Sequence, residues 1–258
     1  IEEAIKLIRI AKKSGANAIK LQTYTADTIT IKSDKNDFKI SSKSPWNKYK
    51  NLYELYDKAS TPWIWHRRLF KEAAKNNLEI FSSPFDETAV NLLEELGCPI
   101  YKVASFEMTD IPLIKKIAST KKPMIISTGM ANIKEIELTF KTAKKYGARD
   151  ITLLYCVSNY PSKISDFNLN NIKILKEKFK CRVGLSDHSK DEKVAVAAIA
   201  AGAEVIEKHI TLNKKMRGPD HKASMEPKDF SYLVRSVRNI EKAIGNGLKK
   251  PSKSEKKN

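Results

Sequence analysis

The sequence predicts an α/β fold, an eight-stranded (β/α)8 TIM barrel whose first strand is missing from the chain. Short apolar runs alternate with amphipathic helical segments, which is typical of a parallel sheet covered by helices. The length of 258 residues suits one barrel. The chain opens on a helix at Ile1 rather than on Met, so we expect the preceding strand to be absent from this fragment. An open doubly wound sheet is the alternative, but no Gly-x-Gly-x-x-Gly supports it.

The predicted elements follow one another in strict alternation. A first helix spans Glu2 to Ser14, because Ala4, Ile5, Ile8 and Ala11 share one face, and Gly15 ends it. Seven apolar runs then predict strands at 18–22, 79–82, 100–104, 123–127, 151–156, 182–185 and 204–207.

Helices are predicted between most of these strands. Amphipathic spacing indicates helices at 133–146 and 193–201, and a last helix from about Pro227 to Ile244. Asp110, followed by Ile111 and Pro112, is a good helix start, since an aspartate accepts from free backbone N–H groups and proline suits the first turn. Residues 1–247 therefore form one predicted catalytic domain, and the lysine-rich residues 248–258 a linker.

A long insertion from about Tyr24 to Ser60 interrupts the alternation after the first strand. It is rich in lysine, asparagine, serine and aromatic residues, including Trp46, Tyr53 and Tyr56. Loops of this length in a compact domain are usually functional or disordered. Because the insertion leaves the carboxyl end of a strand, we expect it to cover a substrate.

The composition excludes several functional classes. The formal net charge is +18, but the lysines are dispersed over nearly every helix, so we expect no nucleic-acid partner. No apolar run approaches a membrane span and no secretory signal opens the sequence, which predicts no membrane partner. The three cysteines are widely spaced without a Cys-x-x-Cys, which indicates free thiols in the cytoplasm rather than a structural zinc site.

Two of the four histidines stand at the ends of successive predicted strands. His188 follows the run at Val183 to Leu185, and His209 follows Val205 and Ile206. Neutral imidazoles at adjacent strand ends can converge on one divalent metal. A local hydrogen bond is the alternative for each histidine. His221 could contact a substrate, whereas His66 reads as structural.

Polar residues mark the carboxyl end of every predicted strand, where barrel enzymes build their sites. These residues are Lys20, Gln22, Ser82, Ser83, Lys102, Ser105, Glu107, Ser127, Thr128, Ser158, Tyr160, Ser186, Asp187, His188, Glu207 and His209. Lys20 and Lys102 lie on apolar strands, where burial is costly unless a counter-charge is present. Together with the hydroxyls they predict a pocket for phosphate or carboxylate. A structural ion pair with Glu107 or Glu207 is the competing interpretation.

Seven motifs resemble those of the sialic acid synthase family of nonulosonic acid synthases. They are Lys20-Leu21-Gln22-Thr23, Phe81-Ser82-Ser83-Pro84-Phe85, Tyr101-Lys102-Val103-Ala104-Ser105, Ser127-Thr128-Gly129-Met130, Ser158-Asn159-Tyr160-Pro161, Gly184-Leu185-Ser186-Asp187-His188 and Glu207-Lys208-His209-Ile210-Thr211. The resemblance runs in order from about Ala11 to Ile244. It implies a barrel that condenses phosphoenolpyruvate with an N-acetylated amino sugar, releases phosphate and uses a divalent metal, Mn²⁺ or Mg²⁺.

The resemblance also implies a role for each matching residue. His188 and His209 would be metal ligands and would take part in catalysis, with Glu207 in acid–base or positioning work. Lys20, Ser83, Lys102, Ser105 and Ser127 would hold phosphoenolpyruvate, while Gln22, Glu107, Tyr160 and Asp220 would face the sugar. Ser158 and Ser186 complete the expected substrate contacts.

The resemblance leaves the sugar and the remaining domain as expectations. The long insertion and Ser158 resemble the pseudaminic acid branch, whereas Gly218 to Ser224 resembles the N-acetylneuraminate branch, which uses N-acetylmannosamine; we favour pseudaminate. Family members also carry a small antifreeze-like domain after the barrel, which implies a homodimer in the full-length parent and a linker at 248–258. A metal-dependent barrel hydrolase is the alternative from another class, although it predicts metal ligands where Lys20 and the serines stand.

Overall fold

The molecule is built from seven parallel strands with helices outside them, which confirms the predicted α/β class. The computed structural model describes residues 1–44, 46–252 and 254–257. The strands are β1 (Ala18–Thr23), β2 (Glu79–Pro84), β3 (Tyr101–Val103), β4 (Met124–Ser127), β5 (Ile151–Cys156), β6 (Arg182–Asp187) and β7 (Ile206–Lys208). All seven coincide with predicted runs to within a few residues at each end.

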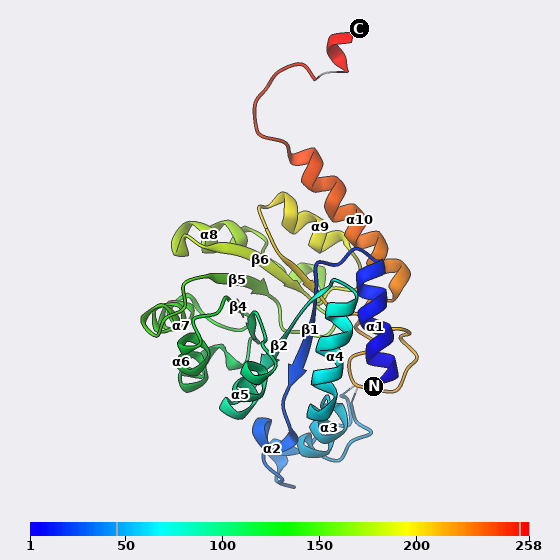
Figure 1. Cartoon of the computed structure of the whole chain (residues 1–258), viewed down its shortest axis with the longest axis vertical. Coiled ribbons are helices and arrows are strands. Elements are labelled where there is room, and N and C mark those ends of the chain that lie inside the picture. Colours follow the sequence, from blue (N-terminus) through cyan, green and yellow to red (C-terminus); the bar gives the residue numbers. More distant parts are fainter. Residues whose placement is uncertain (45, 253, 258) are drawn as a thin grey trace.

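The sheet keeps the order of the sequence. Each strand pairs in parallel with the next one, from β1 to β7, so β1 and β7 are its two edges. Figure 1 shows the strands curling about a common axis, with the helices around the outside. This curl brings the carboxyl ends of all seven strands to one end of the molecule, where the predicted site lies.

The helices of the described residues cover the outer side of the sheet, apart from the short helices of the insertion after β1. They are α1 (Glu2–Lys13), α2 (Ala26–Ile29), α3 (Leu52–Ala59), α4 (Trp63–Lys75), α5 (Glu87–Glu95), α6 (Ile111–Ser119), α7 (Ile133–Lys145), α8 (Asn170–Phe179), α9 (Lys193–Ala200) and α10 (Pro227–Ile244). The predicted helix start at Asp110 is confirmed, since its side chain accepts from the backbone N–H of Leu113. Short 3₁₀ turns lie at Asn36–Phe38, Glu107–Thr109, Ile164–Asp166 and Glu255–Lys257.

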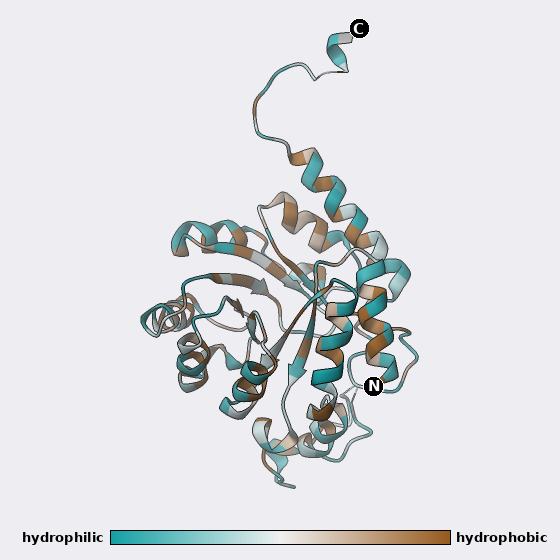
Figure 2. Cartoon of the chain, in the orientation of Figure 1, coloured by the Kyte–Doolittle hydropathy of each residue, from teal (hydrophilic) through white to brown (hydrophobic). Residues whose placement is uncertain are grey.

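The core lies between the strands and these helices. One large cluster includes Leu93, Ile114 and Leu153, and a second, which includes Ile8 and Leu69, packs α1 and α4 against the β1–β2 edge. Figure 2 shows hydrophobic residues along the strands and along one side of α1, and mostly hydrophilic residues after α10. Within the described residues, no helix is both long and apolar enough to cross a bilayer.

The insertion at 24–60 contains short helices rather than only loop. It holds α2, the 3₁₀ turn at Asn36–Phe38 and α3, and lies at the end to which the β1 arrow points (Figure 1). Trp46 donates its indole N–H to the carbonyl oxygen of Pro219 at 3.0 Å, so the insertion contacts the loop after β7. Residue 45 of the insertion and residues 253 and 258 of the predicted linker lie outside the described residues.

Candidate active site

Two lysines meet one carboxylate at the carboxyl end of the sheet. Glu207 Oε1 on β7 lies 3.3 Å from Lys20 Nζ on β1 and 3.8 Å from Lys102 Nζ on β3. Ser186 Oγ donates to the same Glu207 oxygen at 2.9 Å, and Lys102 Nζ donates to Ser127 Oγ at 2.7 Å. The structure therefore joins five predicted residues, from five strands, in one charged cluster. The predicted ion pair of a lysine with Glu207 is present, and the hydroxyls of Ser186 and Ser127 contact it.

Burial shifts the pKa values of this cluster. The Lys102 side chain is 1% exposed, and burial lowers its pKa to about 8. Burial would raise the pKa of Glu207, but Lys102 and Lys20 outweigh it and lower that pKa to about 2. Glu207 is therefore a carboxylate at neutral pH, able to hold the lysines or accept a proton, and it is not a proton donor. The cluster carries two ammonium groups against one carboxylate, so it can take up an anion.

The two predicted metal ligands lie together beside this cluster. The ring centroids of His188 and His209 are 5.5 Å apart, and the Tyr160 ring lies 4.1 Å from His188 and 5.8 Å from His209. His188 Nδ1 lies 2.9 Å from the carbonyl oxygen of Val157, which favours a proton on Nδ1 and leaves Nε2 as an acceptor. Burial, followed by the charge of Lys20, lowers the pKa of His209 to about 3, so its imidazole is neutral.

These imidazoles fit part of a metal site. Neutral ring nitrogens suit first-row divalent ions, and the Nδ1 contact with Val157 is the kind of second contact that orients a ligating histidine. No group of three or more His, Cys, Asp or Glu side chains that could hold a metal occurs in the part of the chain that the structure describes. His188 and His209 thus fit an ion that takes its other ligands from water and substrate oxygens.

Gly129 is part of the site although the sequence analysis named it only within a motif. Its backbone N–H donates to Ser105 Oγ at 3.1 Å. A Cβ atom at this position would lie 2.1 Å from Ser158 Oγ and 2.7 Å from Ser105 Oγ. The absence of a side chain at Gly129 therefore lets two predicted substrate contacts approach each other. The signal was the Gly129 in Ser-Thr-Gly-Met directly after a strand.

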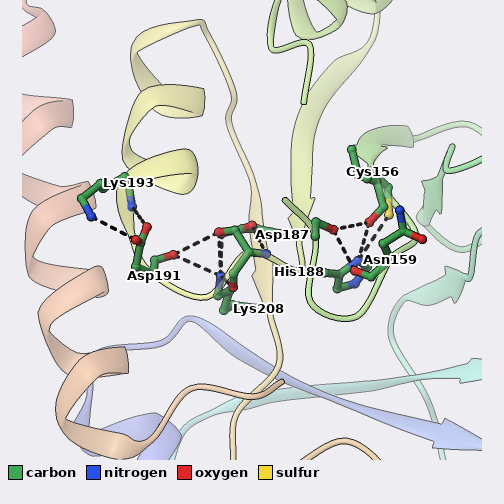
Figure 3. A network of polar contacts seen from close by, with 10 residues as sticks. Cys156, Asn159, Asp187, His188, Asp191, Lys193 and Lys208 are labelled. Carbon is green, nitrogen blue, oxygen red and sulfur yellow. Dashed lines mark hydrogen bonds and ion pairs between the residues drawn. The ribbon is translucent and has the colours of Figure 1, made fainter. Parts of the chain in front are cut away.

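Cys156 was also missed as a site residue. Its Sγ lies 3.8 Å from His188 Nδ1 and 3.7 Å from Ser158 Oγ. Because Cys156 is the last residue of the buried strand β5, the sequence showed only a small apolar residue there. Figure 3 shows Cys156 and Asn159 beside His188.

The predicted sugar contacts Glu107 and Asp220 are half-buried carboxyl groups. Glu107 Oε2 has no hydrogen-bond partner among the described residues, and burial raises the Glu107 pKa to about 7. Burial also raises the pKa of Asp220. The rings of Tyr24 and Tyr56 contact each other edge to face, with centroids 6.0 Å apart. Asp220 lies near the Tyr24 hydroxyl, and Glu107 lies near the Tyr56 hydroxyl. The insertion thus supplies aromatic residues beside the two acids.

Two predicted substrate contacts, Gln22 and Ser83, form no hydrogen bond with these clusters among the described residues. Gln22 and Ser83 are register partners on β1 and β2, and Ser83 Oγ is buried without a partner among the residues described.

The remaining histidines have protein partners. His66, fully buried, bonds to Thr23 Oγ1 at 2.8 Å, as its structural interpretation predicts, and His221 Nδ1 lies 2.7 Å from Thr211 Oγ1.

A concave surface lies away from the strand ends. It is a groove between α1 and α10 that includes the basic side chains of Lys13, Arg235 and Lys242. None of the predicted site residues lines it. The chemistry suggested by the sequence is therefore concentrated at the carboxyl end of the sheet.

Comparison with known proteins shows the family to which the chain belongs. The NeuB family matches residues 7–249. A pseudaminic acid synthase from Campylobacter jejuni subsp. jejuni serotype O:2 is 45% identical over 247 residues, covering 96% of this chain and 71% of that protein. An N,N'-diacetyllegionaminic acid synthase from the same strain is 44% identical over 258 residues, covering 99% of this chain and 76% of that protein.

A solved structure has the same fold. The crystal structure of an N-acetylneuraminic acid synthetase from Leptospira borgpetersenii serovar Hardjo-bovis superimposes with a TM-score of 0.86 and is 34% identical. The match covers 99% of this chain and 84% of that one. The relatives are enzymes that make sialic-type acids. Because the family model matches almost the whole length of the chain, this chain is a member of the NeuB family.

Proposed function

We propose that the protein condenses phosphoenolpyruvate with an open-chain N-acetylated amino sugar, giving a nonulosonic acid and inorganic phosphate. The observation that carries this proposal is the contact of Lys20 and Lys102 with Glu207 beside the His188–His209 pair. One pocket thereby offers a cationic region for a phosphorylated carboxylate and two imidazoles for a carbonyl partner. The names of the relatives support a synthase of this class.

The anion region fits phosphoenolpyruvate by charge and by donors. Lys20 and Lys102 supply positive charge, while Ser127, Ser105 and Ser83 supply hydrogen bonds, the Ser83 hydroxyl having no partner among the described residues. Phosphoenolpyruvate binding also supplies the counter-charge that the buried Lys102 ammonium needs.

The reaction joins carbon 3 of phosphoenolpyruvate to the aldehyde carbon of the sugar. Water then adds to the cationic carbon 2, and the resulting intermediate collapses to the 2-keto acid as phosphate leaves. Lys20 and Lys102 stabilise the phosphate and carboxylate charge throughout. Glu107, with a pKa of about 7, holds a proton near neutral pH that the new sugar alkoxide can take.

A divalent metal, Mn²⁺ or Mg²⁺, is part of this proposal. Held by His188 and His209, it would polarise the sugar carbonyl oxygen as a Lewis acid. The protein's part is to keep the His209 imidazole neutral, through burial that lowers its pKa, and to orient His188 through its contact with Val157.

Pseudaminic acid synthesis is the proposed specific activity. Trp46 and Tyr56 belong to the insertion whose motifs favour this branch. Trp46 lies against the loop that bears Pro219 and Asp220, and Tyr56 lies near Glu107. N-acetylneuraminate synthesis from N-acetylmannosamine is the alternative. A cytoplasmic location and a homodimeric parent protein belong to the same proposal.

Phosphate release tests the reaction and the sugar together. The chain is assayed with phosphoenolpyruvate and Mn²⁺, using either N-acetylmannosamine or the diacetamido-trideoxy-altrose precursor of pseudaminate. We expect release that requires both the altrose derivative and the metal. A preference for N-acetylmannosamine would transfer the proposal to the other branch. Release that is equal with and without any sugar would contradict the synthase proposal altogether.

A further inference from the structure

A buried ion pair lies directly behind the two histidines. Lys208 Nζ on β7 is 2.7 Å from Asp187 Oδ2 on β6, and the two side chains are 2% and 0% exposed. Figure 3 shows this pair on the far side of β6 from Cys156, in a network that continues to Asp191 and Lys193. The sequence analysis placed Asp187 among the polar residues at the strand ends but gave it no role, and it named Lys208 only within a motif.

Strand alternation explains how the pair and the histidines are related. Successive side chains point to opposite faces of a strand. Ser186 is the register partner of Glu207, and Asp187 is the register partner of Lys208. Ser186 and Glu207 meet in the pocket, so Asp187 and Lys208 must meet on the helix side. His188 and His209 each follow the last residue of their strand, so the same alternation turns them back to the side of Ser186 and Glu207. The ion pair therefore lies one residue before the imidazoles on each strand.

The Lys208 ammonium is fully occupied by the chain that follows β6. Besides Asp187, it donates to the carbonyl oxygens of Ser189 at 2.6 Å and Asp191 at 3.2 Å, and contacts Ser189 Oγ at 3.3 Å. The other Asp187 oxygen, Oδ1, accepts from the backbone N–H of Ser189 at 2.8 Å. These contacts fix Asp187 and Ser189, the two residues on either side of His188 in the sequence. A lysine so placed has no free donor for a substrate.

His209 has the greater need of such support. It follows β7, which has three residues and whose partner among the described strands is β6. His188 is held separately, through Nδ1 by Val157 and through its carbonyl oxygen, which accepts from the Ser162 N–H at 2.9 Å. The side chain that ties the end of β7 to β6 immediately before His209 is that of Lys208.

We propose that the Asp187–Lys208 pair is a positioning device that fixes the separation of the His188 and His209 imidazoles, so that both can bind one divalent cation. This inference rests on the proposed function, since it gives the pair a role in metal binding. Asp187 and Lys208 are positioning residues, because they act through the two histidines and face away from the pocket.

The test compares Lys208→Met with Lys193→Met. Lys193 contacts Asp191 in the same network, at 3.0 Å, but its side chain is 73% exposed and lies beyond the buried pair. Mn²⁺ binding to the metal-free protein is measured by titration calorimetry. We expect the Kd of Lys208→Met to rise about 10- to 100-fold, the range usual for loss of an orienting contact behind a metal ligand. Lys193→Met should bind as the wild type does.

Loss of folding must be separated from loss of positioning. The double variant Asp187→Asn/Lys208→Met removes both charges and avoids leaving one charge unpaired in the interior. Ile117→Ala removes buried side-chain volume in α6, away from the histidines. The double variant should melt close to the wild type and still bind Mn²⁺ weakly, whereas Ile117→Ala should melt lower and keep its Kd. A folded double variant with the wild-type Kd would overturn the proposal.

Histidine ring nitrogen spectra give a readout that needs no metal. In the wild type His188 should show one tautomer, with its proton on Nδ1; in the double variant the ring signals of His188 and His209 should shift and broaden. If the wild type itself binds no Mn²⁺, the proposed metal role fails, and these spectra alone decide on positioning. Unchanged spectra in the double variant would refute it.

Discussion

Lys20 Nζ lies 3.3 Å from Glu207 Oε1, although the two residues come from β1 and β7, the opposite edges of the sheet. Their contact spans the curl of the whole sheet. A flat sheet of the same seven strands would separate these side chains by six strand spacings of about 4.8 Å each. The charged cluster is thus a product of the fold's curvature as well as of its residues.

Lys102 is expected to be essential for anion binding. Lys102→Met removes a buried ammonium that donates to Ser127 Oγ at 2.7 Å. The catalytic efficiency with phosphoenolpyruvate should fall by about 100-fold or more, the usual scale for losing a charge-stabilising donor. Phosphate release at varied phosphoenolpyruvate measures it. Lys122→Met, which breaks a partly exposed pair with Glu94, is the matched control and should keep its activity. Equal efficiency in both variants would count against the anion pocket.

The same lysine predicts a pH dependence. Burial lowers the pKa of Lys102 to about 8, so its charge is present below that pH and is lost above it. Because kcat/KM reports the free enzyme, kcat/KM for phosphoenolpyruvate should decline as pH rises through about 8. Measurement from pH 6.5 to 9.5 checks this decline. A decline of the same size in Lys102→Met would assign it to another group.

Gly129 is expected to affect turnover more than stability. In Gly129→Ala the new methyl group would displace the hydroxyls of Ser105 and Ser158, which lie 2.7 and 2.1 Å from its position. These are side-chain ends that can rotate, so the melting temperature should change little while phosphate release falls. Gly184→Ala gives the contrast, because its methyl group would lie 2.2 Å from the backbone oxygen of Val205. That variant should lose about 1–3 kcal/mol of stability, measured by urea unfolding.

Thr23 is expected to stabilise the β1–β2 edge through His66. Thr23 Oγ1 bonds to His66 Nε2 at 2.8 Å and to Ser82 Oγ at 2.6 Å, and all three residues are fully buried. Thr23→Val leaves two buried polar groups short of a partner, which should cost about 1–3 kcal/mol in the free energy of unfolding. Thr88→Val, at an exposed position, should change it by less than about 0.5 kcal/mol. Urea denaturation of both variants decides the matter.

Trp46 is expected to act on the sugar and not on phosphoenolpyruvate. Trp46→Phe removes the indole donor to the Pro219 carbonyl, the bond that holds the insertion against the loop bearing Asp220. A bond of this kind contributes about 0.5–1.5 kcal/mol, so KM for the sugar should rise about 2- to 10-fold with KM for phosphoenolpyruvate unchanged. Trp65→Phe, packed against the α1–α4 core, is the control. A rise in both constants would indicate general loosening instead.

The sequence predicted the strands and most site residues because each carries a local signal. All seven apolar runs are strands, and polar residues such as Ser127 and Asp187 stand where those strands end. Helix bounds at Pro227–Ile244 follow from amphipathic spacing and a proline at the start. These features depend on residues close together in the chain.

The remaining features depend on contacts between distant residues. The pairing of Lys208 with Asp187 needs the β6–β7 register, and the role of Gly129 needs the position of Ser158. The short helices of the insertion lacked a long apolar period, so α2 and α3 could not be predicted. Whether a polar strand end faces the pocket or the helices was likewise fixed only by the register.

The sequential order of the strands has a consequence for how the chain folds while it is being synthesised. Each described strand pairs with its neighbour in the sequence, so these strands can pair in the order in which they are synthesised. Glu207, the carboxylate between Lys20 and Lys102, stands on β7 and is therefore synthesised after both lysines. Until then two ammonium groups converge without their counter-ion, and a cellular phosphate or carboxylate could occupy their place. The nascent chain would thus encounter anions before its pocket is complete.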